Sequence, residues 1–338
     1  MKKLRILALM HPQLVPPDSL EGHTEEEINV WKTEYDVVSH LRAIGHEVRV
    51  LGVQYELLPI RDAVEDWKPH TVFNLLEEFH GEVLFDQNVV SFLELLKVPY
   101  TGCNPRGMII SRGKALSKKL LLYHRIRVPD FAVFPMGRKV KRPPRLAFPL
   151  IVKSLIEHAS VGIAQASVVD SDEKLAERVR FIHERVGTDA IAEQFIEGRE
   201  LYVSVMGNER LVAFPAWELV AEKLADNAPL IATAKVKHDI EYQARHGIDI
   251  RAAELTPEQK VFLEHVSKRI YKILELSGYA RIDFRLGGDG NFYFLEANPN
   301  PEIAQREEFA SAAKAGGVAY PELLQRIINL GLRQRRVE

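Results

Sequence analysis

Residues 279 to 302 read Tyr279-Ala-Arg-Ile-Asp-Phe-Arg-Leu-Gly-Gly-Asp-Gly-Asn-Phe-Tyr-Phe-Leu-Glu-Ala-Asn-Pro-Asn-Pro-Glu302, and this stretch carries the strongest structural signal in the chain. Two runs of alternating side chains flank the cluster Gly287-Gly288-Asp289-Gly290. Alternation is typical of strands with two different faces, and such a glycine-rich cluster favours a turn. We therefore predict an antiparallel hairpin.

The polar side chains of this hairpin fall on one face. Arg281 and Asp283 share a side of the first strand, and Glu296 and Asn298 share a side of the second. A four-residue turn places Arg281 opposite Glu296, with Asp283 as its diagonal neighbour. Carboxylates this close repel unless a cation lies between them, and hard oxygen ligands suit Mg2+ that carries a nucleotide phosphate. We therefore predict that Asp283, Glu296 and Asn298 bind the metal.

The alternative is a solvated hairpin face that holds one salt bridge. Phe292 and Phe294 fall on the same side as Glu296 in a regular strand, which argues against full exposure of that face. We therefore prefer the metal site.

Other short motifs precede the hairpin in a fixed order: Leu75–Gly81, Val98–Gly102, Ser111–Lys114, Phe148–Lys153, Ser160–Gly162 and Ile191–Glu200. Each motif is weak, whereas their order and spacing together are specific. The arrangement resembles the ATP-grasp ligases over nearly the whole chain, and within them the D-alanine–D-alanine ligase family most closely. The resemblance implies an ATP-grasp fold. An N-terminal α/β domain comes first in the chain, and two α+β subdomains that enclose ATP follow it.

Length and composition agree with a large enzyme. The chain has 338 residues, which suggests two or three domains. It has 45 lysines and arginines and 47 acidic residues, so it carries no excess of positive charge that would attract nucleic acid or an anionic membrane. No apolar run approaches the roughly 20 residues that span a bilayer. The single Cys103 cannot form an internal disulfide, so we expect a reducing cytoplasm.

The alternation of strand-like and helix-like sequence patterns predicts how the chain is divided into domains. Strands at 6–9, 48–53 and 71–76 with a helix at 25–43 favour a doubly wound parallel-sheet domain over residues 1–110. Residues 111–197 and 198–338 then form the central and C-terminal ATP-grasp subdomains. We expect helices at 114–123 and 174–185, and loops at 133–149 and 218–257, where no clear period is seen. The basic cluster at 139–145 is interrupted by prolines, so we interpret it as a solvated turn.

Two lysines are candidates for contact with the ATP phosphates. Lys153 ends an apolar strand, so its ammonium can reach a ligand at the strand end, although lysines at strand ends are common. The resemblance implies that Lys114 and Lys153 bind phosphate, where point charges offset developing negative charge. It also places Ser160 in the loop that covers the phosphates, and we count Ser160 among the catalytic candidates. Backbone amides can serve there whatever the side chains are.

The segment around residue 195 resembles the linker that holds adenine. In that family the backbone meets the base edge and apolar side chains cover its ring, which implies nucleotide contacts for Glu193, Phe195 and Ile196. Glu200 matches the carboxylate that accepts hydrogen bonds from the ribose. The alternative is that the apolar residues are ordinary core and Glu200 is a surface charge.

The resemblance also implies a mechanism. A substrate carboxylate attacks the γ-phosphoryl group of ATP to give an acyl phosphate and ADP, and an amine then displaces phosphate. Arg281 stabilises the developing oxyanion, while two Mg2+ ions, with Mn2+ as an alternative, are held by the hairpin. Lys235 aligns with a lysine of the mobile loop that excludes water, although Lys237 is an alternative counterpart.

The chain departs from the family pattern where substrates bind. Ala159 replaces a loop serine that bridges to an N-terminal glutamate, for which Glu26 is the best counterpart, although Glu26 also fits a helix N-terminus capped by Thr24. His80 is retained as a substrate candidate, but the acidic segment after it is changed. Glu302 stands where the family binds the second substrate's carboxylate, so it would repel a carboxylate and favour a cationic or amine group.

Three functions fit these residues. The first is an ATP-dependent carboxylate–amine ligase, acting on an amino acid or small peptide other than D-alanyl-D-alanine. The second is a D-alanine–D-alanine ligase with an altered pocket. The third is a nucleotide-binding regulator without turnover, which the retained Arg281 disfavours. The resemblance suggests a homodimer, and the partners are small carboxylates and amines, without nucleic acid or membrane.

Overall fold

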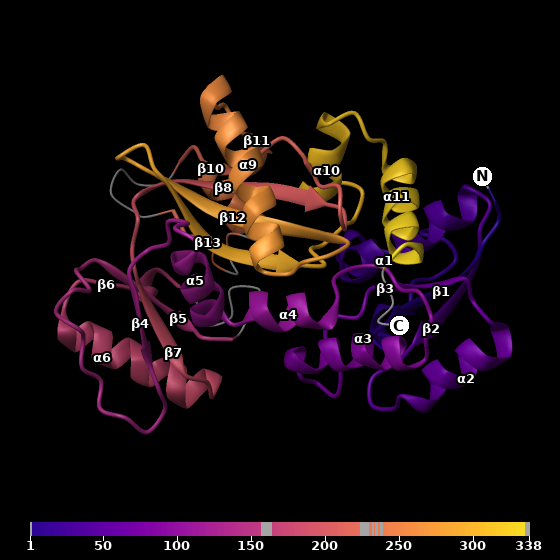
Figure 1. Ribbon diagram of the computed structural model, residues 1–338, viewed down its shortest axis with the longest axis horizontal. Helices are drawn as coiled ribbons and strands as arrows, with labels where there is room; N and C mark the ends of the chain where they lie inside the picture. Colours follow the sequence, from indigo (N-terminus) through magenta and orange to yellow (C-terminus); the bar gives the residue numbers. More distant parts are fainter. Residues whose placement is uncertain are drawn as a thin grey trace.

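The computed structural model describes residues 2–156, 164–223, 230–231, 233, 236 and 239–334 (Figure 1). The N-terminal sheet and its helices lie at one end of the molecule, the small central sheet lies at the other, and the C-terminal sheet lies above and between them. Within the described ranges, no helix has the length and apolar character needed to cross a membrane.

The N-terminal domain is built on three parallel strands in the order β2-β1-β3. Ile6, Ala8 and Met10 point to one face of this sheet, and Leu7 and Leu9 point to the other. Both faces are therefore covered, as the doubly wound prediction requires. The elements are β1 (Arg5–Met10), η1 (Pro12–Leu14), α1 (Glu25–Ala43), β2 (Glu47–Gly52), α2 (Leu58–Trp67), β3 (Thr71–Asn74), η2 (Val83–Phe85) and α3 (Asp86–Leu95).

The helices α10 (Glu308–Ala315) and α11 (Tyr320–Leu332) return from the C-terminal part of the chain to the N-terminal sheet. Phe309, Leu324 and Ile328 belong to the same buried cluster as Ile6 and Val37. The two ends of the chain therefore share one core.

The central unit is a four-stranded antiparallel sheet in the order β4-β7-β5-β6. Its helix α6 ends at Phe181, earlier than the sequence predicts, and continues as a π turn to Gly187, whose φ of 75° ends it. The elements from the connecting helices onward are α4 (Pro105–Arg112), α5 (Lys114–Tyr123), β4 (Phe131–Phe134), β5 (Leu150–Ser154), η3 (Gln165–Ser167), β6 (Val168–Val169), α6 (Asp172–Phe181), η4 (Ile182–Val186) and β7 (Ala190–Gln194).

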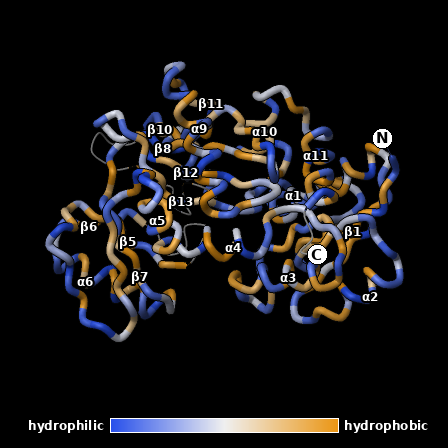
Figure 2. The backbone as a smooth tube through the Cα atoms, in the orientation of Figure 1, coloured by the Kyte–Doolittle hydropathy of each residue, from blue (hydrophilic) through white to orange (hydrophobic). Residues whose placement is uncertain are grey.

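The C-terminal unit is a six-stranded antiparallel sheet in the order β11-β10-β8-β12-β13, with β9 pairing to β8. Helix α9 covers one face, and its buried residues join those of β8, β12 and β13 in the largest core cluster. Orange, hydrophobic segments follow these central strands in Figure 2. The elements are β8 (Gly198–Met206), β9 (Val212–Ala213), β10 (Trp217–Ala221), α8 (Ile240–His246), β11 (Ile248–Ala252), α9 (Pro257–Ile273), β12 (Tyr279–Gly287) and β13 (Phe292–Pro299).

The prediction that residues 218–257 form a loop is wrong for much of that segment. Strands β10 and β11 pair from Trp217 opposite Ala252 to Ala221 opposite Ile248. Between them, α8 is capped by the Asp239 side chain and ends at Gly247, whose φ is 58°. The sequence hides these elements because β11 is a short edge strand, half exposed to solvent, with little apolar alternation.

Candidate functional site

The hairpin of β12 and β13 forms as predicted, but its register differs. Arg281 lies opposite Asn298, and Asp283 lies opposite Glu296. The prediction that Arg281 faces Glu296 is therefore wrong. The cause is an irregularity after Asp283, where Phe284 pairs with Phe294 and Leu295 is left as an extra residue in a β-bulge.

The bulge also changes which side chains share a face. Phe292 and Phe294 are buried with Phe284 and Ala297 in the core beneath the sheet. Glu296 pairs with Asp283, the residue before Phe284, and so belongs to the opposite face. The expectation that the phenylalanines share the side of Glu296 is thus wrong. The hairpin has one apolar face for the core and one polar face for chemistry.

Arg281 is held on this polar face by three groups. Its Nε and one terminal nitrogen donate to the two oxygens of Asp283 at 2.8 and 3.0 Å. Its other terminal nitrogen is 3.6 Å from Glu308 at the start of α10, and the guanidinium lies 4.8 Å from the ring centre of Tyr202. Burial lowers the pKa of Arg281, but Asp283 and Glu308 outweigh it and hold that pKa above its ordinary value. Arg281 is therefore a fixed, charged donor, paired with Asp283 rather than Glu296.

The predicted metal ligands meet on adjacent strands. Asp283 and Glu296 are register partners, and the Asn298 amide donates to Asp283 at 3.0 Å. No cluster of three or more His, Cys, Asp or Glu residues in the described ranges could hold a metal by itself. Two carboxylates and an amide nevertheless fit Mg2+, which is usually bound through one or two carboxylates, water and substrate phosphates. Since Arg281 occupies both oxygens of Asp283, the ion would compete with it.

Lysines from two elements converge beside this face. Lys114, at the start of α5, places its Nζ 3.9 Å from Glu296. Lys153, on β5, and the fully buried Lys118, on α5, lie 3.3 and 3.2 Å from the two oxygens of Glu193. Burial raises the pKa of Glu193, but Lys118 and Lys153 outweigh it and lower that pKa, so the carboxylate is ionised. Burial lowers the pKa of Lys114, and Glu296 offsets this only in part.

The predicted adenine linker lies at the end of β7. Phe195 is buried with Ile151 and Ile231 in a small apolar cluster, and Ile196 is half-buried. The Glu193 side chain points to the lysines, so any contact of this residue with adenine has to come from its backbone. The apolar cluster adjoins the lysines, because Ile151 and Lys153 lie two residues apart on β5 and so share a face of the sheet.

Glu200, the predicted ribose ligand, is buried rather than on the surface. One of its oxygens accepts from Arg285 at 2.7 Å, and the other accepts from the Tyr202 hydroxyl at 3.0 Å. Arg285 also donates to the backbone oxygen of Gly198 and lies 5.8 Å from the Phe195 ring centre. Glu200 therefore stands beside the linker, oriented by two neighbours.

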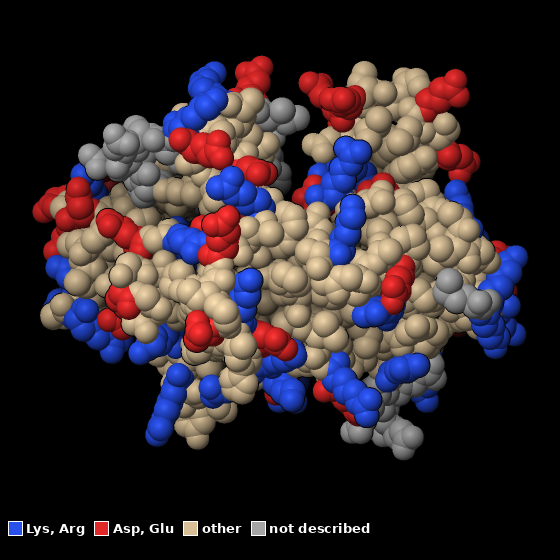
Figure 3. Space-filling model, turned by 90° about the horizontal axis from the view of Figure 1, so that it is seen from above, with Lys and Arg blue, Asp and Glu red and all other residues tan. Residues whose placement is uncertain are grey.

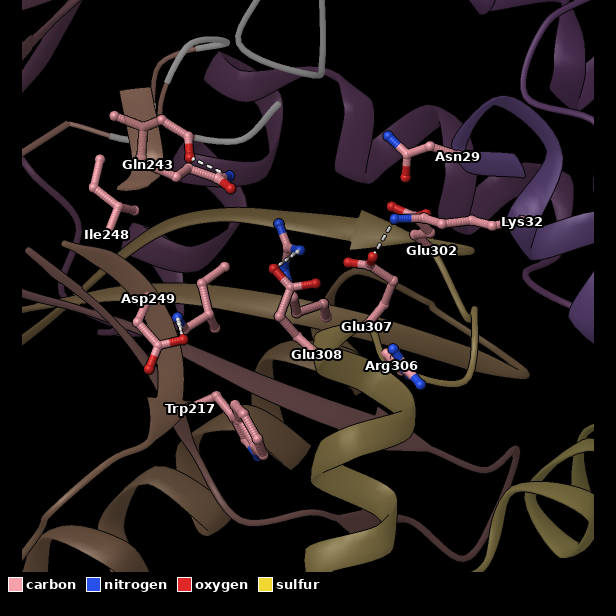
Figure 4. Close-up of a pocket in the computed structure, with 13 residues that line it drawn as sticks. Asn29, Lys32, Trp217, Gln243, Ile248, Asp249, Glu302, Arg306, Glu307 and Glu308 are labelled. Atoms are coloured by element: carbon pink, nitrogen blue, oxygen red, sulfur yellow. Dashed lines mark hydrogen bonds and ion pairs between the residues drawn. The ribbon is translucent and has the colours of Figure 1, made fainter. Parts of the chain in front are cut away.

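A cavity of about 490 Å³ opens next to Arg281 (Figure 4). Glu302, which the sequence makes a candidate for substrate contact, lines it. Its carboxylate is 3.4 Å from the Nζ of Lys32, which also contacts Glu307, and it accepts from the Thr33 hydroxyl at 3.2 Å. In Figure 4, Lys32 reaches across from α1 to these glutamates. Lys32 therefore offsets part of the negative charge that Glu302 brings.

Two other substrate candidates lie elsewhere. Glu26 is exposed in the first turn of α1, where Thr24 forms a capping box with Glu27; Glu26 does not line the 490 Å³ cavity, although Asn29 of the same helix does. His80 is exposed, with φ of 63°, and its ring packs edge-on against Tyr55. It is also absent from the lining of that cavity.

Several candidates lie outside the described residues: Ala159, Ser160, Lys235 and Lys237.

The sequence reasoning missed four residues of the site. Lys118 and Arg285 are buried within ion pairs. Lys32 reaches the cavity from α1, far away in the chain, and Glu308 reaches it from the start of α10, shortly after the hairpin. Only the i, i+4 spacing of Lys118 from Lys114 signals a shared helix face. One residue of the Ser111–Lys114 motif stabilises the fold: Arg112 donates two hydrogen bonds of 2.6 Å to the buried carboxylate of Asp86.

Comparison with known proteins agrees with this geometry. A family model described as the C-terminus of D-ala D-ala ligase matches residues 123–329. The D-alanine–D-alanine ligase of Aquifex aeolicus is 30% identical over 307 residues, which cover 90% of this chain and 96% of that protein. The Bordetella petrii enzyme of the same name is 32% identical over 253 residues, 74% of this chain and 73% of its own length.

The fold is also similar to that of a solved structure. The Bacillus anthracis D-alanine–D-alanine ligase, crystallised in complex with ATP, superposes with a TM-score of 0.74 at 24% identity. The match covers 98% of each chain. The similarity therefore extends through all three units of the fold.

Proposed function

Because this chain belongs to the D-alanine–D-alanine ligase family, whose members are ADP-forming carboxylate–amine ligases that use ATP and Mg2+, we propose that it joins an amino acid or small peptide to an amine through an acyl phosphate. The substrate carboxylate oxygen bonds to the γ-phosphorus as the bond to ADP breaks. The amine nitrogen then bonds to the acyl carbon, and phosphate leaves.

One observation carries this proposal: the polar face of the hairpin adjoins both the lysines and the cavity. Glu296 lies 3.9 Å from Lys114 on one side, and Arg281 lines the cavity on the other. A phosphoryl group bound between them would touch both the metal ligands and the substrate. Such positioning supplies most of the catalysis in phosphoryl transfer.

The chain's residues have separate roles in this scheme. Asp283, Glu296 and Asn298 hold Mg2+, which offsets the phosphate charge when it is bound. Lys114 and Lys153 orient the phosphates. Arg281, rigidly held by its carboxylate partners, donates to the oxygen that becomes negative at the acyl carbon.

The nucleotide base and sugar have their own residues. Phe195 and Ile196 cover adenine, the backbone of Glu193 and its neighbours meets the base edge, and Glu200 accepts from ribose. The resemblance assigns Ser160 to the phosphate loop, Lys235 or Lys237 to the loop that closes the site, and Glu26 and His80 to the first substrate. It also underlies our proposals of two Mg2+ ions, with Mn2+ as a substitute, a homodimer and a cytoplasmic location.

For the acceptor, we propose a substrate that carries a cationic or amine group. Acidic side chains slightly outnumber basic ones in the cavity lining: Asp249, Glu302, Glu307 and Glu308 against Lys32, Arg281 and Arg306. Charges on the face in Figure 3 are mixed in sign. The names of the relatives favour D-alanine as an alternative substrate.

The test is an ADP-release screen with Mg2+ and ATP over single carboxylates, with hydroxylamine as a surrogate amine. A ligase forms ADP only with a particular carboxylate and yields its hydroxamate. Release of ADP with D-alanine alone among the carboxylates, together with formation of D-alanyl-D-alanine when hydroxylamine is left out, would identify a D-alanine–D-alanine ligase. If ATP binds but no carboxylate elicits ADP, the ligase proposal is wrong.

A further inference from the structure

Lys118 is the most deeply buried charged side chain of the site. Its exposed fraction is 0%, on the inner face of α5. The Nζ donates to the backbone oxygen of Leu295, lies 3.2 Å from Glu193 and sits 5.3 Å from the ring centre of Phe294. An ammonium without solvent is strongly unfavourable unless its surroundings supply charge and acceptors, and here Glu193 and Leu295 do so.

Glu193 is shared between two cations. It is 1% exposed, and its two oxygens face Lys118 and Lys153 separately, at 3.2 and 3.3 Å. One negative charge therefore serves two positive charges. Lys153 is 13% exposed, whereas Lys118 is not exposed at all, so of these two lysines only Lys153 can reach a bound nucleotide.

We propose that Lys118 is a positioning residue: by binding Glu193 it leaves the charge of Lys153 available to the nucleotide phosphate. The proposal rests on the phosphate role of Lys153 given above. Without Lys118, Glu193 would neutralise Lys153 and compete with phosphate for its ammonium. Glu193 and Lys118 thus act as a pair, and the effect of removing one should depend on whether the other is present.

The bulge fixes the position of Lys118. Leu295, whose carbonyl accepts from the Nζ, is the extra residue of β13 and precedes the metal-ligand candidate Glu296. Lys114, one helical turn before Lys118, reaches Glu296 itself. Helix α5 is therefore attached to β7 and to β13 at two neighbouring points.

A double-mutant cycle on the full-length protein tests this role. The variants are Lys118→Met, Glu193→Gln and the two together, with Lys119→Met as the control, since Lys119 is the exposed neighbour on α5. The dissociation constant of the non-hydrolysable ATP analogue AMP-PNP with Mg2+ is measured by titration calorimetry, and thermal unfolding is followed in parallel.

The expected signs differ between the variants. Lys118→Met should weaken binding by about tenfold or more, because Glu193 then pairs with Lys153 alone. Glu193→Gln should weaken binding far less than Lys118→Met does, although it lowers thermal stability because Lys118 and Lys153 lose their shared carboxylate. The double variant should recover to within about threefold of the wild type, since the competing carboxylate is gone. Lys119→Met should bind like the wild type.

Other results would overturn the proposal. Wild-type affinity in Lys118→Met would do so, and so would a double variant that binds no better than Lys118→Met, which is the result for a lysine that only supports the fold. If Lys118→Met does not fold, Glu193→Gln is compared with the double variant, and a loss of more than about tenfold between them counts against the role. Unchanged affinity in Lys153→Met would contradict the phosphate role itself, and with it this inference.

Discussion

The two carboxylates of the proposed metal site should respond differently to the same chemical change. Asp283→Asn and Glu296→Gln each replace a charged oxygen donor by an amide of nearly the same shape. Both should abolish ADP release, because each removes an anionic ligand from Mg2+. Only Asp283, however, also accepts two hydrogen bonds from an arginine.

The structure gives the size of that difference. The side chains of Asp283 and Arg281 are 3% and 14% exposed, with contacts of 2.8 and 3.0 Å. Removing one partner of a buried ion pair costs about 3–5 kcal/mol. Because Glu308 lies 3.6 Å from Arg281 and still offsets part of its charge, the free energy of unfolding of Asp283→Asn should fall by about 3 kcal/mol. Glu296 is 25% exposed and its partner Lys114 is buried, but the 3.9 Å between them is longer than a hydrogen bond, so the loss of Glu296 should cost less, about 1–2 kcal/mol.

Urea denaturation followed by circular dichroism measures both losses, and a coupled assay for ADP measures turnover. Glu322→Gln, which removes an exposed carboxylate from an i, i+4 pair on α11, is the control for both assays. Equal stability of the two variants would show that Asp283 does not neutralise Arg281. Wild-type turnover in either variant would remove the basis for the metal site.

Three further outcomes are expected. Arg281→Ala should slow hydroxamate formation by about 10²–10³ but change AMP-PNP affinity far less, and equal losses in rate and affinity would contradict its role as an oxyanion donor. Glu302→Gly should reduce kcat/KM for acceptors with a second ammonium group relative to neutral analogues, whereas an unchanged ranking would place the residue outside acceptor recognition. Burial, with added repulsion from Glu77 and Glu302, raises the pKa of Glu34 to about 7, so its buried carboxyl favours the folded state while protonated. The wild type should therefore lose about 3 kcal/mol of stability relative to Glu34→Gln between pH 5 and pH 8, and parallel urea-denaturation curves for the two proteins would refute this.

Much of the fold can be predicted from the sequence because the local signals, such as helix caps and apolar strand patterns, are strong. The helix Glu25–Ala43 has the predicted bounds, since Thr24 caps its first turn. Strand β1 is an almost continuous apolar run, as expected for a strand buried on both faces. Predictions fail where tertiary contacts determine the secondary structure. The edge strand β11 is an example, because it is extended through its pairing with β10 and its own sequence has little strand signal.

The same distinction holds in the site. Residues with a motif around them, such as Lys153 and Asp283, could be named in advance as candidates. Lys32 could not, because its contact with Glu302 joins the first helix to a loop near the other end of the chain. Lys118 resembles any lysine on a basic helix until the fold buries it against Glu193. Such residues are defined by their partners rather than by their neighbours in sequence.

The bulge at Leu295 shows why a one-residue difference in register matters for function. Without an extra residue, Glu296 and Asn298 would follow Phe292 and Phe294 on a single face, and either the carboxylate would enter the core or the phenylalanines would leave it. The bulge lets Phe294 stay buried while Glu296 turns toward Lys114. Because the extra carbonyl accepts from Lys118, the same residue that separates the two faces also attaches the strand of Glu296 to the lysine helix. The carbonyl of Leu295 therefore links the register of the hairpin to the position of the Lys118 ammonium group.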